Sequence, residues 1–262
     1  MGVFRCRLTV LVVLLTALAW CDGGGAALAG DIVVSGAASL TSAMTEIKNA
    51  FEASHPDRKV YVNFASSGQL LQQIEAGAPV DVFAPADQET MDRAQQHGLI
   101  DASSRVDFTA NDLMLVVPCD SKDVHCAKDL TDAKVDRIAL GEPDAVPAGS
   151  YTKQALAKLG LWDTLSPKMV YGLSVKQALD YVALGEVGAA FIYGTDARLA
   201  PDRIRIIMNM GGHTPIVYPA AVVAGSAQKD GAREFIAFLT SDAGQTILAK
   251  YGFKKPGEVK EK

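Results

Sequence analysis

The chain has 262 residues, 49% of them hydrophobic, and a formal net charge of −5 at pH 7. Proteins that bind nucleic acid present a basic face, so this acidic balance argues against a nucleic-acid partner. It does not exclude a small anion, because one bound ion responds to nearby dipoles rather than to the total charge.

The N-terminus has the pattern of a secretion signal. Arg5 and Arg7 precede an uncharged run over 8–20, and Ala-Leu-Ala at 27–29 matches a small-x-small cleavage site. The run is too short to cross a bilayer as a helix, which takes about 20 residues. We therefore predict an exported protein whose signal peptide, 1–29, is cleaved near Ala29.

The four cysteines divide into two pairs. Cys6 and Cys21 lie in the predicted leader, and bulky Trp20 before Cys21 disfavours a lipid anchor there. Cys119 and Cys126 stay in the mature chain, seven positions apart. In an oxidising compartment a disulfide between them is favoured over a metal site, with two free thiols as the alternative.

After the leader, short β-branched runs alternate with helical patterns, which is typical of an α/β fold. Strands are predicted at 31–34, 60–64 and 80–84, and helices at 40–51, 70–74 and 88–96. The first helix carries apolar residues at 40, 44, 47 and 51, a spacing that places them on one face. Gly77 is placed to end the second helix.

The second half of the chain repeats this alternation. Strands are predicted at 113–117, 137–140, 189–193, 203–208 and 218–223, and helices at 151–159, 175–184, 235–239 and 245–251. A loop rich in proline and glycine, 141–149, precedes the first of these helices. We predict two α/β lobes, each a mainly parallel sheet flanked by helices: lobe 1 from 30–111 plus 220–262, and lobe 2 from 112–219.

Motifs of the common enzyme classes are missing from the sequence. There is no Gly-x-Ser-x-Gly elbow, no Gly-Lys-Ser/Thr phosphate loop and no Gly-x-Gly-x-x-Gly after a strand. The four histidines, at 55, 97, 125 and 213, have no second ligand at metal-binding spacing. We predict that the chain is not an enzyme and has neither catalytic residues nor a cofactor.

Several predicted helices begin with small or hydroxylated residues that follow a strand. These are Ser39, Ser66-Ser67, Ala148-Gly149 and Ser174-Val175. The first N–H groups of a helix lack intrahelical partners and lie at its positive end, so several helix starts aimed at one point can bind an anion. Ser66 with Gln69, and Ser174 with Gln177, also match the capping box, and on spacing alone ordinary capping is the simpler explanation.

Seven segments, in order over nearly the whole mature chain, together resemble the periplasmic molybdate-binding proteins of ABC transporters. They are Gly-Ala-Ala-Ser-Leu-Thr (36–41), Phe-Ala-Ser-Ser-Gly-Gln-Leu (64–70), Gln-Ile-Glu-Ala-Gly-Ala-Pro-Val-Asp-Val-Phe (73–83), Pro-Asp-Ala-Val-Pro-Ala-Gly (143–149), Leu-Gly-Leu-Trp-Asp-Thr-Leu-Ser-Pro-Lys (159–168), Ile-Tyr-Gly-Thr-Asp-Ala (192–197) and Tyr-Pro-Ala-Ala-Val-Val (218–223). The resemblance implies a type II periplasmic-binding-protein fold with its ligand cleft between the lobes. It also implies a monomer in the periplasm that binds molybdate, and tungstate with it, with high affinity and delivers it to a membrane ABC permease. Another tetrahedral oxyanion, such as sulfate, is the alternative.

Carried over residue by residue, the family's ligand positions fall on Ser39, Ser67, Ala148, Val175 and Tyr193. By this resemblance the serines give a hydroxyl and a backbone N–H each, the alanine and valine give backbone N–H groups, and the tyrosine gives its hydroxyl. Molybdenum would then be held only within the oxyanion, with no direct bond from protein to metal. A ferric-ion binder of the same fold would want several converging tyrosines, and only Tyr193 lies in a predicted ligand loop.

Overall fold

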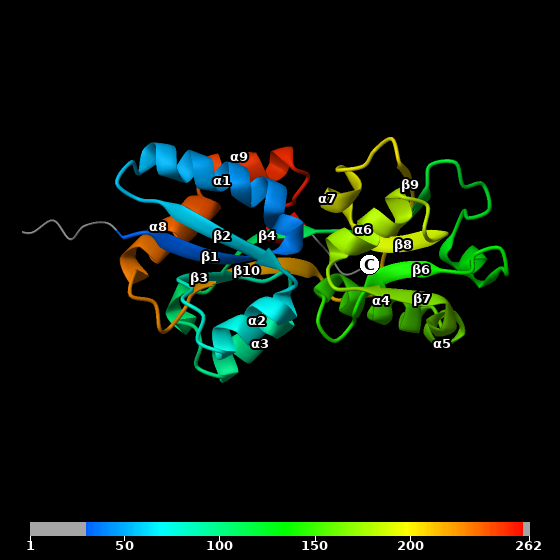
Figure 1. Ribbon diagram of the computed structural model, residues 1–262, viewed down its shortest axis with the longest axis horizontal. Helices are drawn as coiled ribbons and strands as arrows, with labels where there is room; N and C mark the ends of the chain where they lie inside the picture. Colours follow the sequence, from blue (N-terminus) through cyan, green and yellow to red (C-terminus); the bar gives the residue numbers. More distant parts are fainter. Residues whose placement is uncertain (1–29, 259–262) are drawn as a thin grey trace, which may run out of the picture.

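Residues 30–258 are described by the computed structural model as two lobes placed end to end, each built on a five-stranded sheet (Figure 1). The strand order is β2-β1-β3-β10-β4 in the first sheet and β7-β6-β8-β5-β9 in the second. Residues 1–29 and 259–262 lie outside the described part, and with them lie the predicted signal peptide and Cys21.

The first sheet consists of β1 (Ile32–Ala37), β2 (Val60–Ala65), β3 (Val82–Ala84), β4 (Val106–Asn111) and β10 (Ile216–Val222). The second consists of β5 (Leu113–Pro118), β6 (Ile138–Gly141), β7 (Met169–Gly172), β8 (Ala189–Tyr193) and β9 (Ile204–Met210). The α-helices are α1 (Thr41–Ser54), α2 (Ser67–Glu75), α3 (Gln88–Gln96), α4 (Pro147–Lys158), α5 (Trp162–Leu165), α6 (Val175–Ala183), α7 (Gly194–Ala197), α8 (Lys229–Thr240) and α9 (Asp242–Lys250). Short 3-10 turns are η1 (Ala38–Leu40), η2 (Ala102–Ser104), η3 (Ala127–Thr131), η4 (Ser166–Lys168) and η5 (Pro256–Glu258).

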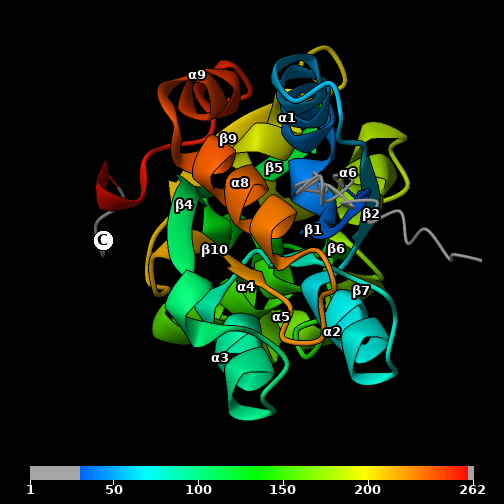
Figure 2. The same ribbon diagram turned by 90° about the vertical axis from the view of Figure 1, so that its left-hand side faces the viewer.

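Helices cover both faces of each sheet. Helices α1, α8 and α9 lie on one face of the first sheet, and α2 and α3 lie on the other (Figure 2). The predicted apolar stripe of α1 is confirmed, since Met44, Ile47 and Phe51 are fully buried beneath it. Each such side chain contributes about 1.5–3 kcal/mol when it leaves water, so this stripe fixes how α1 packs.

Each sheet is mainly parallel, as predicted, but contains one reversed strand, and the chain's crossings between the lobes explain the reversal. Strand β1 is parallel to β2 and β3, and β6 is parallel to β7 and β8. Strands β10 and β5 are antiparallel to both of their neighbours. The chain leaves the first sheet through β4, passes Asp112 and enters the second as β5, then returns between β9 and β10. Parallel neighbours are joined by a crossover helix within one lobe. A strand that enters from the other lobe has no such connection, so it can run antiparallel to its neighbours.

The lobe limits follow from these crossings. The sequence predicts that lobe 2 ends at 219. We propose instead that the chain returns to lobe 1 before Ile216, because the whole of β10 pairs within the first sheet.

Helix α4 begins at Pro147, so part of the segment predicted as a loop is the first turn of a helix. Proline suits this first position because its φ is already helical and its missing N–H would have had no partner there. Strands β4 and β7 were not predicted from the sequence. The predicted end of α2 at Gly77 is confirmed, since Gly77 has φ +83°.

The predicted disulfide between Cys119 and Cys126 is not formed, and both are exposed free thiols. Backbone hydrogen bonds hold the two positions instead. The N–H of Cys119 donates to Arg203 O (3.0 Å), and the N–H of Cys126 donates to Asp129 Oδ2 (3.0 Å). The fold of this loop therefore does not require a bridge.

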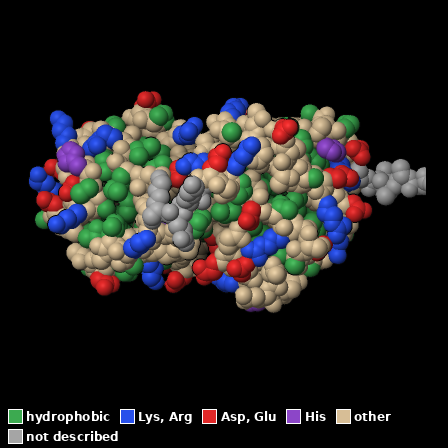
Figure 3. All heavy atoms as spheres, turned by 180° about the vertical axis from the view of Figure 1, so that it is seen from behind, with side chains coloured by type: hydrophobic (Ala, Val, Ile, Leu, Met, Phe, Trp, Pro, Cys, Tyr) green, Lys and Arg blue, Asp and Glu red, His purple; other side chains and the backbone are tan. Residues whose placement is uncertain are grey.

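The surface carries charges of both signs. Figure 3 shows basic and acidic side chains interspersed over both lobes on the face in view. Across residues 30–258, no helix combines the length and apolar character needed to span a membrane, and no group of three or more His, Cys, Asp or Glu side chains could hold a metal ion.

Candidate functional site

A small cavity lies between the lobes and is lined by residues from both. Lobe 1 contributes Ala37, Ala38, Ser39, Ser66, Ser67 and Ala86, and lobe 2 contributes Val146, Pro147, Ala148, Val175 and Tyr193. The structure thus brings all five predicted ligand residues to one place. The cavity has a volume of about 10 Å³, roughly the space of one water-sized sphere, so the two lobes meet closely around it. None of these lining side chains is charged.

Four helical segments begin at this cavity. Ser67 is the first residue of α2 and Val175 is the first residue of α6. Ala148 is the second residue of α4, and Ser39 is the second residue of η1, which continues directly into α1. Backbone N–H groups at these positions have no carbonyl four residues earlier within their helix, and the helix dipoles add positive potential. The cavity therefore offers backbone donors from four directions.

Serines stand at the N-cap positions of α2 and α6, and the next residue in each helix is available to a ligand. Ser174 Oγ accepts from the N–H of Gln177 (3.3 Å), while Gln177 Oε1 accepts from the N–H of Leu173 (2.7 Å). In α2, Gln69 Oε1 accepts from the N–H of Ser66 (3.3 Å). Ser66 Oγ is buried at the cavity without a hydrogen-bond partner among the described residues, so Ser66 is a lining residue that its capping pattern did not reveal.

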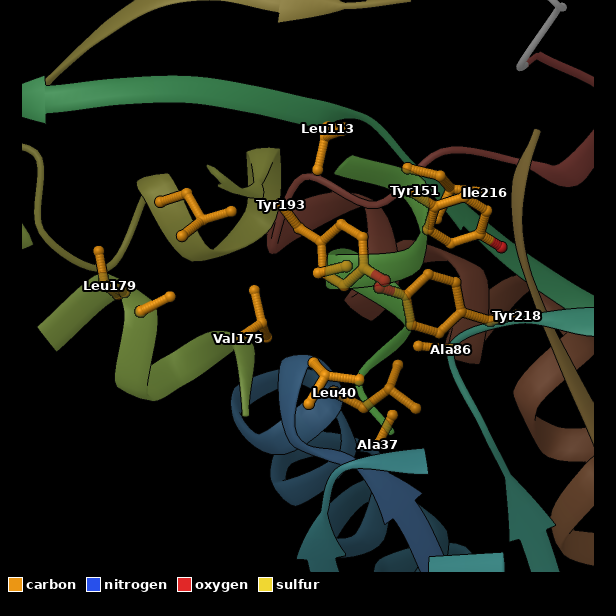
Figure 4. Packing of buried hydrophobic residues seen from close by; sticks show 14 of the residues in the cluster. Ala37, Leu40, Ala86, Leu113, Tyr151, Val175, Leu179, Tyr193, Ile216 and Tyr218 are labelled. Atoms are coloured by element: carbon orange, nitrogen blue, oxygen red, sulfur yellow. The ribbon is translucent and has the colours of Figure 1, made fainter. Parts of the chain in front are cut away.

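Three hydroxyl groups at the cavity have hydrogens to donate. Ser67 Oγ accepts from the N–H of Ala86 (2.9 Å), which leaves its own hydrogen available. Ser39 Oγ lies 3.0 Å from Tyr218 Oη. Tyr193 Oη is buried and has no partner within residues 30–258, although Figure 4 shows the hydroxyls of Tyr193 and Tyr218 pointing toward one another. Burial raises the pKa of Tyr193 well above 10, so this group stays protonated and remains a donor.

The Tyr193 hydroxyl is buried at the cavity and is available to an acceptor there. A buried polar group without a partner costs about 1–3 kcal/mol, and a bound acceptor would remove that cost.

The lobes also touch directly beside the cavity. The N–H of Gly68 in α2 donates to Ala145 O of lobe 2 (3.1 Å). A Cβ at position 68 would lie only 2.8 Å from that oxygen, so the missing side chain permits this approach. This contact could not be predicted from the sequence, because nothing in the local pattern indicates what faces Gly68 from the other lobe.

A buried carboxyl group follows Tyr193 on α7. Asp196 is 2% exposed, and its Oδ2 has no hydrogen-bond partner in the described part of the chain. Burial raises the pKa of Asp196 to about 7, against the opposing effects of a backbone hydrogen bond at Tyr193 and the charge of Lys176. Burial likewise raises the pKa of Asp87 to about 6.

We expect Asp196→Asn to stabilise the unliganded protein at neutral pH. The folded-state pKa of Asp196 lies above its ordinary 3.8, so its contribution to stability is full below about pH 4 and is lost as the pH rises through about 7. Relative to wild type, the free energy of unfolding of the variant should rise across pH 4–7, by at most about 4 kcal/mol. Urea unfolding at each pH measures this difference. Exposed Asp144→Asn is the control and should show no such trend, and a flat difference for Asp196→Asn would contradict the assignment.

Known proteins share this sequence and architecture. Residues 32–254 match the family of bacterial extracellular solute-binding proteins. The molybdate-binding protein ModA of Escherichia coli is 39% identical over 242 residues, covering 88% of this chain and 91% of that protein. The putative ABC transporter substrate-binding lipoprotein YvgL of Bacillus subtilis is 37% identical over 224 residues, 85% of each chain.

A solved structure extends the comparison to three dimensions. The substrate binding domain of a putative molybdenum ABC transporter from Clostridium difficile has 38% sequence identity and a TM-score of 0.68, covering 86% of this chain and 99% of that one. A solute-binding family and a two-lobed fold are both consistent with an interlobe cavity that is lined by hydrogen-bond donors and by no charged side chain. This chain belongs to the family of bacterial extracellular solute-binding proteins, among the relatives that include the molybdate-binding proteins.

Proposed function

We propose that this protein binds molybdate, and tungstate with similar affinity, and delivers it to a membrane ABC permease. The observation that carries the proposal is an interlobe cavity lined by hydrogen-bond donors and by no charged side chain. Two donors from each of Ser39 and Ser67, with one each from Ala148, Val175 and Tyr193, make seven. The names of the relatives from Escherichia coli and Clostridium difficile support molybdate as the ligand.

A site that only donates favours a fully deprotonated oxyanion. Molybdate near neutral pH has four oxygens that only accept hydrogen bonds. Hydrogen phosphate keeps a proton that would find no acceptor, at a cost of about 1–3 kcal/mol. Sulfate has the same charge and shape as molybdate but shorter bonds, so the size of the cavity must reject it. Tungstate is nearly the same size as molybdate.

Delivery would depend on lobe closure. Ser39 and Ser67 lie on lobe 1, and the other three proposed ligand residues lie on lobe 2, so the anion is fully held only when the lobes meet. A permease can recognise that closed arrangement. The proposal includes cleavage near Ala29, a periplasmic location and a monomeric binding protein that uses no cofactor.

Anion titration of the mature protein tests the function. A ligand at 100 times its Kd stabilises the folded state by about 2.7 kcal/mol, which raises Tm by roughly 5–10 °C in a chain of this size. We expect molybdate and tungstate to do so at micromolar concentrations, and sulfate and phosphate only at far higher ones. Equal shifts from sulfate and molybdate would contradict the assignment.

A further inference from the structure

A buried hydrogen-bond chain lies behind Ser39. Ser39 Oγ is 3.0 Å from Tyr218 Oη, and Tyr218 Oη is 3.2 Å from Asn111 Nδ2. Tyr218 is fully buried and Asn111 is 1% exposed, so solvent does not compete for these bonds. Neither Asn111 nor Tyr218 lines the cavity. They contact the site through the hydrogen bond to Ser39 and, from Tyr218, through an edge contact with the ring of Tyr193.

The amide of Asn111 sets the direction of this chain. Asn111 Oδ1 accepts from the N–H of Asp112 (3.0 Å), which assigns the amide orientation, because a flipped amide would turn its NH₂ group toward that N–H. The two amide hydrogens are thereby directed to Tyr218 Oη (3.2 Å) and Thr195 Oγ1 (2.9 Å). An amide nitrogen can only donate, so Tyr218 Oη accepts at this contact.

The orientation of the Tyr218 hydroxyl determines, in turn, how Ser39 is hydrogen-bonded. Burial raises the pKa of Tyr218 far above 10, so its hydroxyl keeps its hydrogen. With an oxygen lone pair occupied by Asn111, that hydrogen is available to Ser39 Oγ, 3.0 Å away. Ser39 then has its own hydrogen free for the cavity, and donors linked in series strengthen one another.

We propose that Asn111 and Tyr218 are positioning residues that hold the Ser39 hydroxyl as a donor toward the bound anion. The proposal rests on the proposed binding of molybdate. A serine hydroxyl otherwise donates or accepts equally well. Held as a donor, Ser39 favours an anion without protons and disfavours one that must donate, so the chain Asn111–Tyr218–Ser39 contributes to discrimination as well as to affinity.

Tyr218→Phe tests the proposal because it removes one hydroxyl and preserves the ring. Affinities for molybdate and for hydrogen phosphate are compared at pH 8, where both are dianions and differ by one proton. We expect the molybdate affinity to fall about tenfold, as for one lost hydrogen bond. The affinity for hydrogen phosphate should stay or rise, because Ser39 Oγ becomes free to accept. The molybdate-to-phosphate ratio should therefore fall at least tenfold.

Tyr151→Phe is the matched control. Tyr151 is another buried tyrosine, but it does not line the cavity, and Figure 4 shows its hydroxyl directed away from those of Tyr193 and Tyr218. Its removal should leave the ratio unchanged. A general loosening of the fold would lower both affinities together and would not change the ratio.

Asn111→Asp provides a second test that does not depend on the first variant folding. An aspartate is the same size but can only accept, so the hydrogen of Tyr218 turns toward position 111 and Ser39 donates backwards to Tyr218. We expect the molybdate affinity to fall about a hundredfold. The added charge weakens the binding of both dianions alike, so the expected fall in the molybdate-to-phosphate ratio comes from the reversed hydrogen bonds. An unchanged ratio in either folded variant overturns the proposal. If the wild-type protein does not bind molybdate, the proposed function fails instead, so the two failures are distinguishable.

Discussion

The double variant Ser39→Ala, Ser67→Ala is expected to bind molybdate about three powers of ten more weakly than the wild-type protein. In the proposed site each hydroxyl donates to the dianion, and a hydrogen bond to a charged group contributes about 1.5–3 kcal/mol. Since every 1.4 kcal/mol is a factor of ten, each single variant should lose one to two powers of ten. Loss of Ser67 Oγ also leaves the N–H of Ala86 without its partner.

Titration calorimetry with molybdate measures the loss, and the chain offers a matched control in Ser35. This serine lies on β1, is fully buried and has an Oγ with no hydrogen-bond partner in the described structure, but it does not line the cavity. Ser35→Ala should bind as the wild type does. A double variant that retains wild-type affinity would show that the anion binds elsewhere.

The second large effect is expected from Val175→Pro, which deletes a backbone donor. Val175 is the first residue of α6, where proline is compatible with a helix, and Ser174 before it is extended (φ −155°, ψ 162°), as a residue before proline must be. The variant should fold, yet it loses one N–H, and the proline ring occupies the space into which that hydrogen pointed. We expect molybdate affinity to fall by at least two powers of ten.

Val175→Ala separates this effect from the loss of the valine side chain. It removes most of the side chain but keeps the N–H, so its affinity should stay within about threefold of the wild type. The unliganded melting temperatures of both variants report on packing. If Val175→Pro folds and binds as tightly as Val175→Ala does, the N–H of residue 175 does not contact the anion.

Local pattern predicted most of the secondary structure. Strand β8 was predicted at its observed limits, and the stripe of α1 gave both the helix and the face it buries. Strand β4 was missed although Val106–Asn111 alternates apolar and polar residues at every position, the period of a strand. Its place in the sheet depends on pairing with distant β10. The start of α4 was missed because a proline-rich segment reads equally well as a turn.

For the candidate site, the spacing of residues fitted either helix capping or anion binding, whereas the resemblance to a family pointed to specific ligand positions. Ser67 and Val175 follow serines at N-cap positions, so ordinary capping was a sufficient explanation of the pattern. Only the likeness to molybdate-binding proteins selected five positions. That these residues bind the anion stays a prediction. Ser66, Gly68 and Asn111 were not singled out for the site, because their roles come from groups that face them across the fold.

The sequence by itself determined the alternation of strands and helices, the apolar faces of the helices and the family. These depend on residues a few positions apart, whose periodicity fixes which face becomes buried. Only the tertiary structure decided the reversed strand in each sheet, the free thiols and the hydrogen-bond chain from Asn111 to Ser39. Tyr218 and Ser39 are 179 positions apart, and Asn111 and Tyr218 are 107 apart. No local period connects such residues, because sheet order and lobe crossings bring them together.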